Sequence, residues 1–178
     1  MVDETADLSK AGRDIVEGAY FDNDLLCVGE KEIIVVEAVK GQLLRALQNA
    51  GAFLVPPAAE TRLTHTVLEG HRLKREFLGK DASVILSAAG ISAPPETKIA
   101  IFESNIEHPL VPEEQLMPVV PVVRARNFDQ AVEMAVRAER GYEHTAIIHS
   151  REAGRISAFA RAINTCIFVA NAPSYAWS

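Results

Sequence analysis

The sequence predicts an α/β fold in which helices cover both faces of a mostly parallel sheet, so that the domain has three α/β/α layers. Short apolar runs typical of strands alternate along the chain with segments whose apolar residues recur at helical spacing. The segments that separate successive strands are short, which favours right-handed crossovers between parallel strands. The length of 178 residues suits a single domain with a substantial core.

The first elements are a helix, a short loop, a strand and a second helix. Apolar residues on one face predict the first helix from Asp7 to about Tyr20. The loop of residues 21–27 follows, and the apolar run of residues 33–36 predicts a strand. The second helix ends near Gly51, and its predicted apolar face consists of Val39, Leu43, Leu44, Leu47 and Ala50.

Residues 53–80 give the weakest pattern. Pro56, Pro57 and Gly70 interrupt this stretch, and residues 61–69 are compatible with either a short helix or irregular structure. A further helix is predicted from about Asp81, and Gly90 is placed to end it.

The next two apolar runs predict strands at residues 99–102 and 118–123. Pro121 lies within the second run and has no N–H group to donate to a neighbouring strand. We therefore expect the second of these strands to lie at an edge of the sheet or to be interrupted.

The following helix has the clearest boundaries in the sequence. Asn127 is its predicted N-cap, Gln130 stands three residues later, and Gly141 ends it. Residues 145–148 and 166–169 predict the last two strands, and Ser150 is expected to cap the helix between them.

The composition argues against several classes of protein. Lys and Arg total 18 and Asp and Glu total 24, which gives a net charge of −6, so nucleic acid is not the expected partner. No apolar run approaches the roughly 20 residues that cross a bilayer, and the acidic N-terminus lacks a signal-peptide pattern. Two cysteines make no disulfide framework, so we expect a cytoplasmic protein with reduced thiols and no membrane partner. No glycine-rich phosphate-binding loop is present either.

The histidines and cysteines give little support to a metal or hydrolase site. Zinc ligands need short helical or knuckle spacings, whereas His144 and His149 bracket a predicted strand at an odd separation that would direct them to opposite faces. His65 and His71 lie in the weakly patterned segment, so we expect no metal site. There is no G-x-S-x-G elbow, but a protease-like pair of Cys27 with a loop histidine stays open.

The positions of Cys27 and Glu114 suggest chemistry. Cys27 lies in a loop between a helix and a strand, where a thiol can reach a cleft, and Lys31 adds positive charge nearby in sequence. The residues alone leave equally open that Cys27 is a small buried hydrophobe, and the strand pattern around Cys166 predicts a core position for that second thiol. Glu113 and Glu114 directly precede an apolar strand, where a solvated turn is the simpler alternative.

Four stretches of the chain together resemble one protein family. They are residues 2–31 with Phe21-Asp22-Asn23, Cys27 and Glu30-Lys31, residues 108–118, residues 141–150, and residues 164–176. In this order they resemble the aldehyde dehydrogenase superfamily, and within it the coenzyme-A-acylating propionaldehyde and acetaldehyde dehydrogenases of bacterial propanediol and ethanolamine breakdown. The resemblance implies the fold of an aldehyde dehydrogenase catalytic domain.

The same resemblance implies roles for individual residues and for cofactors. The Cys27 thiolate would form a hemithioacetal with a short-chain aldehyde, NAD would accept the hydride, and coenzyme A would accept the acyl group as co-substrate. Glu114 would bind the ribose on the nicotinamide side of NAD. The segment beside the substrate tunnel would supply Asn171, Pro173, Ser174 and Tyr175.

The resemblance also sets expectations for the whole protein. Residues 1–178 are expected to be one cysteine-bearing catalytic domain, with an amino-terminal Rossmann-like cofactor domain and a carboxy-terminal oligomerisation arm missing. We expect the isolated chain to be inactive as a dehydrogenase, and the intact enzyme to be a homo-oligomer in the cytoplasm or in a bacterial microcompartment. The alternative is a truncated domain that acts as a binding or assembly module without catalysis.

Overall fold

The computed structural model describes residues 1–70 and 72–177. Its central sheet contains four parallel strands in the order β1-β6-β5-β2. Their apolar residues are buried on both faces of the sheet, as expected for parallel strands covered by helices. The strands are β1 (Ile33–Val36), β2 (Ala52–Leu54), β5 (Ile99–Ser104) and β6 (Val119–Ala125).

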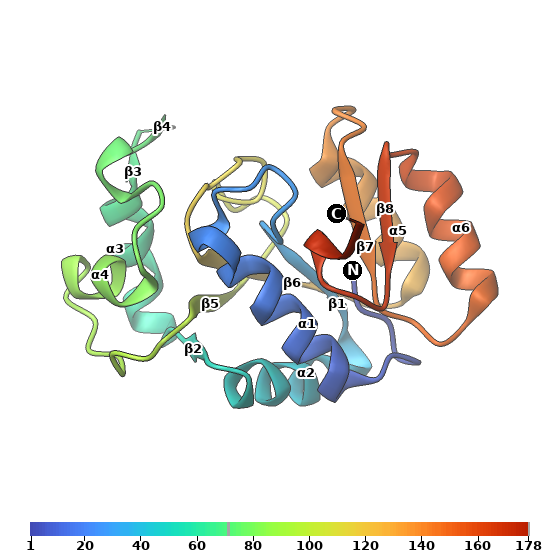
Figure 1. The fold of residues 1–178 in the computed structure, drawn as a ribbon, viewed down its shortest axis with the longest axis horizontal. Coiled ribbons are helices and arrows are strands. Elements are labelled where there is room, and N and C mark those ends of the chain that lie inside the picture. Colours follow the sequence, from blue (N-terminus) through green and yellow to red (C-terminus); the bar gives the residue numbers. More distant parts are fainter. Residues whose placement is uncertain (71, 178) are drawn as a thin grey trace.

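A second parallel pair extends this layer. It consists of β7 (Thr145–Ile148) and β8 (Ile167–Ala170). Val2 makes parallel bridges to both Val35 and His149, and its N–H donates to the Ile34 carbonyl at 2.8 Å. The N-terminal segment therefore joins β1 to β7, and the strands form one layer across the molecule (Figure 1). A separate antiparallel pair is formed by β3 (Leu68–Glu69) and β4 (Arg72–Leu73).

Helices cover both faces of the sheet. Ile33 and Val35 pack against α1 (Leu8–Tyr20) and α2 (Glu37–Asn49), whereas the alternate residue Ile34 packs in the core on the other face. Figure 1 shows α3 and α4 at the β2 end of the molecule and α6 at the β7–β8 end. The predicted three-layer α/β/α fold is thus confirmed. The helices of this second face are α3 (Pro57–Val67), α4 (Ala82–Ala88), α5 (Phe128–Glu139) and α6 (Ala153–Ile163).

Local sequence explains where these helices begin. The Asp7 side chain accepts a hydrogen bond from the Lys10 N–H at 3.1 Å, and Asn127 caps α5 in the same way at 3.0 Å from the Gln130 N–H. In the weakly patterned stretch, Pro57 is the first residue of α3. A proline in the first turn has no need of an N–H donor, so it starts this helix instead of breaking the chain.

Three expectations from the sequence are wrong. Pro121 lies in β6, between β1 and β5, because burial of the neighbouring valines on both faces outweighs the loss of one ladder donor. Glu152, two residues after Ser150, is the N-cap of α6, although the Ser150 hydroxyl accepts a hydrogen bond from the Glu152 N–H at 3.1 Å. Cys166 is exposed and not in the core; it lies in the bend directly before β8.

Three short 3₁₀ segments complete the described structure. They are η1 (Phe21–Asp24), η2 (Arg75–Phe77) and η3 (Ser174–Trp177). Within the described residues, no helix reaches the length and hydropathy that crossing a bilayer requires.

Candidate functional site

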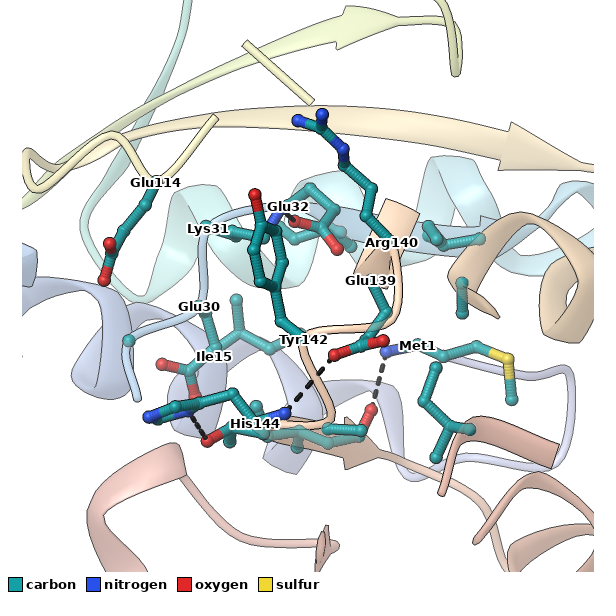
Figure 2. A pocket seen from close by; sticks show the side chains of 18 of the residues that line it. Met1, Ile15, Glu30, Lys31, Glu32, Glu114, Glu139, Arg140, Tyr142 and His144 are labelled. Atoms are coloured by element: carbon teal, nitrogen blue, oxygen red, sulfur yellow. Dashed lines mark hydrogen bonds and ion pairs between the residues drawn. The ribbon is translucent and has the colours of Figure 1, made fainter. Parts of the chain in front are cut away.

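A cavity of about 630 Å³ lies where three segments of the chain meet. Cys27 and Glu114 both line it, together with the segment that leads into β7 (Figure 2). Figure 2 shows Glu114 on one side of the cavity and Glu139, Arg140, Tyr142 and His144 approaching it from the end of α5 and the segment that follows it. The two residues that the sequence singled out therefore face a common space.

The cysteine loop, residues 21–29, presents Cys27 at the surface. Asp22, Asn23 and Asp24 have left-handed backbone conformations with φ of 51°, 52° and 62°. The Gly29 N–H donates to the Leu26 carbonyl at 2.9 Å, which folds the loop into a turn around the thiol. Cys27 is exposed, so the alternative of a buried structural cysteine is wrong.

Glu30 connects the cysteine loop to the C-terminal segment. Its buried carboxylate accepts hydrogen bonds from the N–H of Ser174 at 2.9 Å and from the Ser174 hydroxyl at 2.8 Å. Burial raises the pKa of Glu30 to about 7, and the Ser174 donors oppose part of that rise. A Cβ at Gly18 on α1 would clash with this carboxylate, so the glycine makes room for it.

Asp24 is a second buried acid in this region. Its burial, together with the charges of Glu30 and Glu114, raises its pKa well above the usual range for an aspartate. The Oδ1 atom lacks a hydrogen-bond partner and lies where a Cβ on Gly29 would be. This arrangement favours the neutral carboxylic acid at position 24.

The basic residues of the cavity hold the glutamate loop, which comprises residues 111–116. Lys31 donates from Nζ to the Val111 carbonyl at 2.8 Å and lies 3.0 Å from the Glu32 carboxylate. Arg140 donates from Nη1 to the Pro112 carbonyl at 3.3 Å. The positive charge that the sequence placed near Cys27 therefore lies against the loop that carries Glu114.

Two histidines contribute to the cavity wall. His144 is exposed, and its Nδ1 lies 2.7 Å from the Thr145 hydroxyl. His149 is buried with Nδ1 3.9 Å from Asp14, and burial lowers its pKa to about 3. Both line the same cavity, whose wall includes residues from both faces of the sheet, so the expectation that they face apart stays a prediction.

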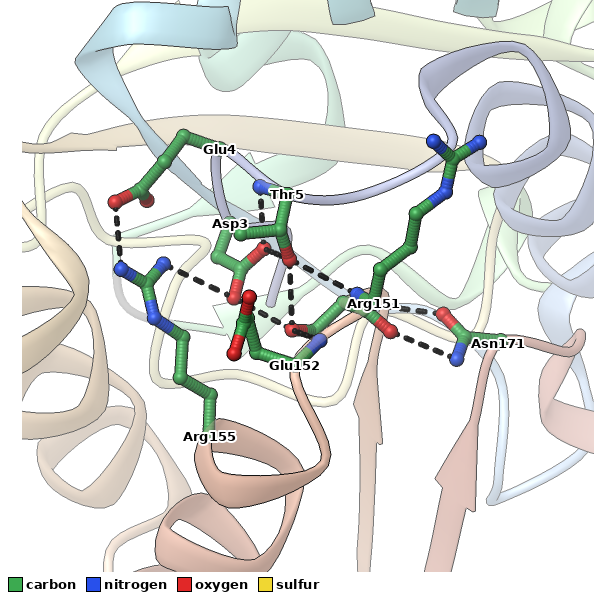
Figure 3. Close-up of polar contacts among 8 residues, drawn as sticks. Asp3, Glu4, Thr5, Arg151, Glu152, Arg155 and Asn171 are labelled. Carbon is green, nitrogen blue, oxygen red and sulfur yellow. Dashed lines mark hydrogen bonds and ion pairs between the residues drawn. The ribbon is translucent and has the colours of Figure 1, made fainter.

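The remaining candidate residues lie outside this cavity wall. The Asn171 side chain accepts from the Ser150 N–H at 3.0 Å and donates to the Ser150 carbonyl at 2.9 Å (Figure 3). Tyr175 packs on Phe21 with ring centroids 5.0 Å apart, beside a hollow of about 450 Å³. Pro173 is half-buried between Asn171 and the Ser174 contact with Glu30.

Sequence reasoning missed the importance of Glu30 and did not assign a role to His108. His108 donates from Nε2 to the Glu60 carboxylate at 2.8 Å, since its Nδ1 accepts from the Leu110 N–H at 3.2 Å.

His71 lies outside the described residues. Among the described residues, no three His, Cys, Asp or Glu side chains are grouped as metal ligands would be.

The chain is similar to known proteins over almost its whole length. It is 44% identical over 177 residues to the propanal dehydrogenase (CoA-propanoylating) of Salmonella typhimurium, a match that covers 99% of this chain and 38% of that protein. No protein-family model matches the chain.

The chain is also similar to solved structures of propionaldehyde dehydrogenases. A propionaldehyde dehydrogenase from the Clostridium phytofermentans fucose utilisation bacterial microcompartment has a TM-score of 0.94 at 43% identity, covering 98% of this chain and 40% of that one. A Rhodopseudomonas palustris propionaldehyde dehydrogenase with bound CoA and an acylated cysteine has a TM-score of 0.95 at 41% identity, with the same coverage. The predicted resemblance to acylating aldehyde dehydrogenases is confirmed, and the chain spans about two fifths of the length of these relatives.

Proposed function

We propose that this chain is the cysteine-bearing part of a coenzyme-A-acylating aldehyde dehydrogenase, an oxidoreductase that converts a short-chain aldehyde to its acyl-coenzyme-A thioester. The observation that carries the proposal is that an exposed thiol, Cys27, and a carboxylate, Glu114, line one cavity. The similarity to propanal and propionaldehyde dehydrogenases supports the aldehyde chemistry.

In the first half of the reaction, the Cys27 thiolate adds to the aldehyde carbonyl carbon and forms a hemithioacetal. The carbonyl oxygen becomes an oxyanion, for which backbone N–H groups of the cysteine loop are the nearest donors in sequence. When bound, NAD would provide the acceptor for the hydride that leaves the same carbon. The carboxylate of Glu114 is exposed toward the cavity, which fits an acceptor of hydrogen bonds from ribose hydroxyls.

In the second half, the acyl group passes from Cys27 to the thiol of coenzyme A. The new carbon–sulfur bond forms as the bond to Cys27 breaks, and Cys27 leaves as a thiolate. A thiol is already a good nucleophile near neutral pH, so the acceptor needs less activation than water would. His144 lines the same cavity and is exposed, which suits it to accept the proton that coenzyme A loses.

The other expectations from the sequence enter here as parts of the proposal. Asn171, Pro173, Ser174 and Tyr175 would support the wall next to the aldehyde, and the contact of Tyr175 with Phe21 in the cysteine loop favours this. Binding of NAD by a Rossmann-like domain, a homo-oligomeric state and a location in a bacterial microcompartment complete the proposal. The microcompartment origin of one similar structure supports the last of these.

The proposal is tested by comparing the reactivity of the two thiols of the chain. Both are exposed, so Cys166 serves as an internal reference for Cys27. Incubation with propionyl-coenzyme A should acylate Cys27 by thiol exchange and leave Cys166 free, as read by peptide mass spectrometry. Cys27 should also react faster than Cys166 with iodoacetamide. Cys27→Ser should abolish acylation, while Cys166→Ser should not. Equal labelling of both thiols, or preference for Cys166, would contradict the proposal.

One observation favours a second candidate, a binding or assembly module without catalysis. Large apolar side chains are exposed around the cysteine loop, and such surface is often covered by a partner. Gel filtration of the chain would show a stable oligomer, and acylation of Cys27 would be absent. The exposed residues are Tyr20, Phe21, Leu25 and Leu26.

A further inference from the structure

We propose that Asn23 and Gly79 form a positioning element that holds the cysteine loop against the glutamate loop and so fixes the place of Cys27 relative to Glu114. The importance of that relation rests on the proposed function, but the contact itself does not. Gly79 lies between η2 and α4, in a segment that the sequence analysis left without a role.

A chain of hydrogen bonds runs through Gly79 from one loop to the other. The Asn23 side-chain amide donates to the Gly79 carbonyl at 3.1 Å and to the Asp81 carboxylate at 2.8 Å. The Gly79 N–H in turn donates to the Leu116 carbonyl at 2.9 Å. One residue thus contacts the cysteine loop through its carbonyl and the glutamate loop through its amide.

The backbone at this junction suits only a few residue types. Gly79 has φ of +67°, and a Cβ there would lie 2.8 Å from Cδ1 of Leu25, a residue of the cysteine loop. Asn23 and Leu116 are also left-handed, with φ of 52° and 51°. Asparagine tolerates that conformation better than most residues, whereas leucine does not. Because Leu116 is held in an unfavourable conformation, the hydrogen bond from Gly79 is needed to keep its carbonyl in place.

The opposite end of the glutamate loop is tied to the cysteine segment as well. Lys31, four residues after Cys27, donates to the Val111 carbonyl at 2.8 Å. The glutamate loop is therefore held at Val111 and at Leu116, and both contacts lead back to the chain around Cys27. A displacement of either loop would be transmitted to the other through these two contacts.

The test uses variants that have matched controls within the same chain. Asn23→Gly removes both hydrogen bonds of the side chain but permits the left-handed backbone. Its control is Asn164→Gly, because Asn164 is also left-handed, with φ of 49°, and donates to the Glu143 carboxylate at 3.1 Å, outside the cavity wall.

A second pair of variants tests the glycine. Gly79→Ala places a Cβ against Leu25, whereas Gly90→Ala has the same φ of +67° with no atom within 4 Å. The two alanine variants therefore share the backbone penalty and differ in the contact with the cysteine loop. The Asn23 variant keeps the test informative even where Gly79→Ala fails to fold.

Two measurements on the whole chain decide the outcome. The first is the rate constant of iodoacetamide alkylation at Cys27 itself, because the control residue Asn164 lies too near Cys166 for that thiol to serve as the reference. We expect this rate constant to change by about fivefold or more in Asn23→Gly, where the side-chain hydrogen bonds are lost, and in Gly79→Ala, where the new Cβ displaces Leu25. The second is amide hydrogen exchange in peptides that cover residues 111–118, which should become faster in the same variants. Both measurements should stay at the wild-type value in Asn164→Gly and Gly90→Ala.

The inference is overturned if Asn23→Gly changes either measurement no more than its control does. It is also overturned if the alkylation rate constant of Cys27 changes while exchange in residues 111–118 does not, since the two loops would then move independently. These results do not depend on dehydrogenase activity. If wild-type Cys27 reacts no faster than Cys166, the proposed function fails, but the comparison of variants still tests the positioning element.

Discussion

Replacement of Glu30 by glutamine should remove a large part of the pH dependence of stability. Burial raises the pKa of Glu30 from 4.5 to about 7 in the folded chain. A carboxyl group with a raised pKa binds its proton more tightly when folded, so it favours the folded state below pH 4.5 and loses this effect as the pH rises toward 7. At about 1.4 kcal/mol for each pH unit, the interval corresponds to about 3 kcal/mol.

The prediction compares the stability of the wild-type chain with that of Glu30→Gln. Glutamine resembles the neutral acid in shape and can still accept the hydrogen bond from the Ser174 N–H. We expect the two proteins to be similarly stable at acid pH, with Glu30→Gln more stable by about 3 kcal/mol above pH 7, where the wild type holds a buried charge. The lowered pKa of His149 contributes equally to both proteins and cancels in the comparison. The Glu30 charge helps to raise the pKa of Asp24, so its removal lowers that pKa and acts in the same direction.

The assay is urea unfolding of both chains at several pH values between 4.5 and 8, followed by circular dichroism. Glu133→Gln serves as a control, because Glu133 is an exposed residue of α5 and its replacement should leave the pH profile unchanged. If Glu30→Gln and the wild type lose stability in parallel across this range, Glu30 is not the buried acid that its contact with Ser174 indicates.

Three further substitutions test the packing and the helix caps, each by the change in the free energy of unfolding in urea. Gly12→Ala should destabilise the chain by about 1–3 kcal/mol, because the new Cβ would lie 2.7 Å from the Ala46 backbone where α1 packs on α2. Gly154→Ala in α6 should instead stabilise it by up to about 1 kcal/mol, since no atom lies within 4 Å of the added Cβ. Asn127→Ala should cost about 1 kcal/mol through loss of the cap on the Gln130 N–H, and an unchanged stability would show that α5 does not depend on it.

The parts of the fold that the sequence predicted well are those in which local chemistry and burial agree. Asn127 with Gln130 marks the start of α5, and the four apolar residues of β1 predict a strand covered on both faces. Pro121 shows the limit of such reasoning, because a single lost donor does not prevent a strand from pairing with a neighbour on each side. Cys166 shows another limit, since the residue directly before β8 lies in an exposed bend, although its apolar neighbours suggest a buried strand.

The candidate site could be predicted in part. Cys27 was singled out by its position between a helix and a strand and Glu114 by its position before a strand, while the resemblance implied their roles; the structure brings both to one cavity. The roles of Glu30 and Gly79 could not be found in this way, because both depend on segments far apart in sequence. The contact of Glu30 with Ser174 spans 144 residues, and that of Asn23 with Gly79 spans 56. No local pattern carries information over such separations.

The conformation of the cysteine loop makes these distant contacts necessary. Three successive non-glycine residues, Asp22 to Asp24, are left-handed, and each costs of the order of 1 kcal/mol relative to ordinary backbone. A loop with that cost would relax if it were free. It is held on one side by Gly79 through Asn23 and on the other by the contact of Glu30 with Ser174. We therefore infer that the exposure of Cys27 is maintained by the surrounding fold, and that loosening either contact should change thiol reactivity before it unfolds the domain.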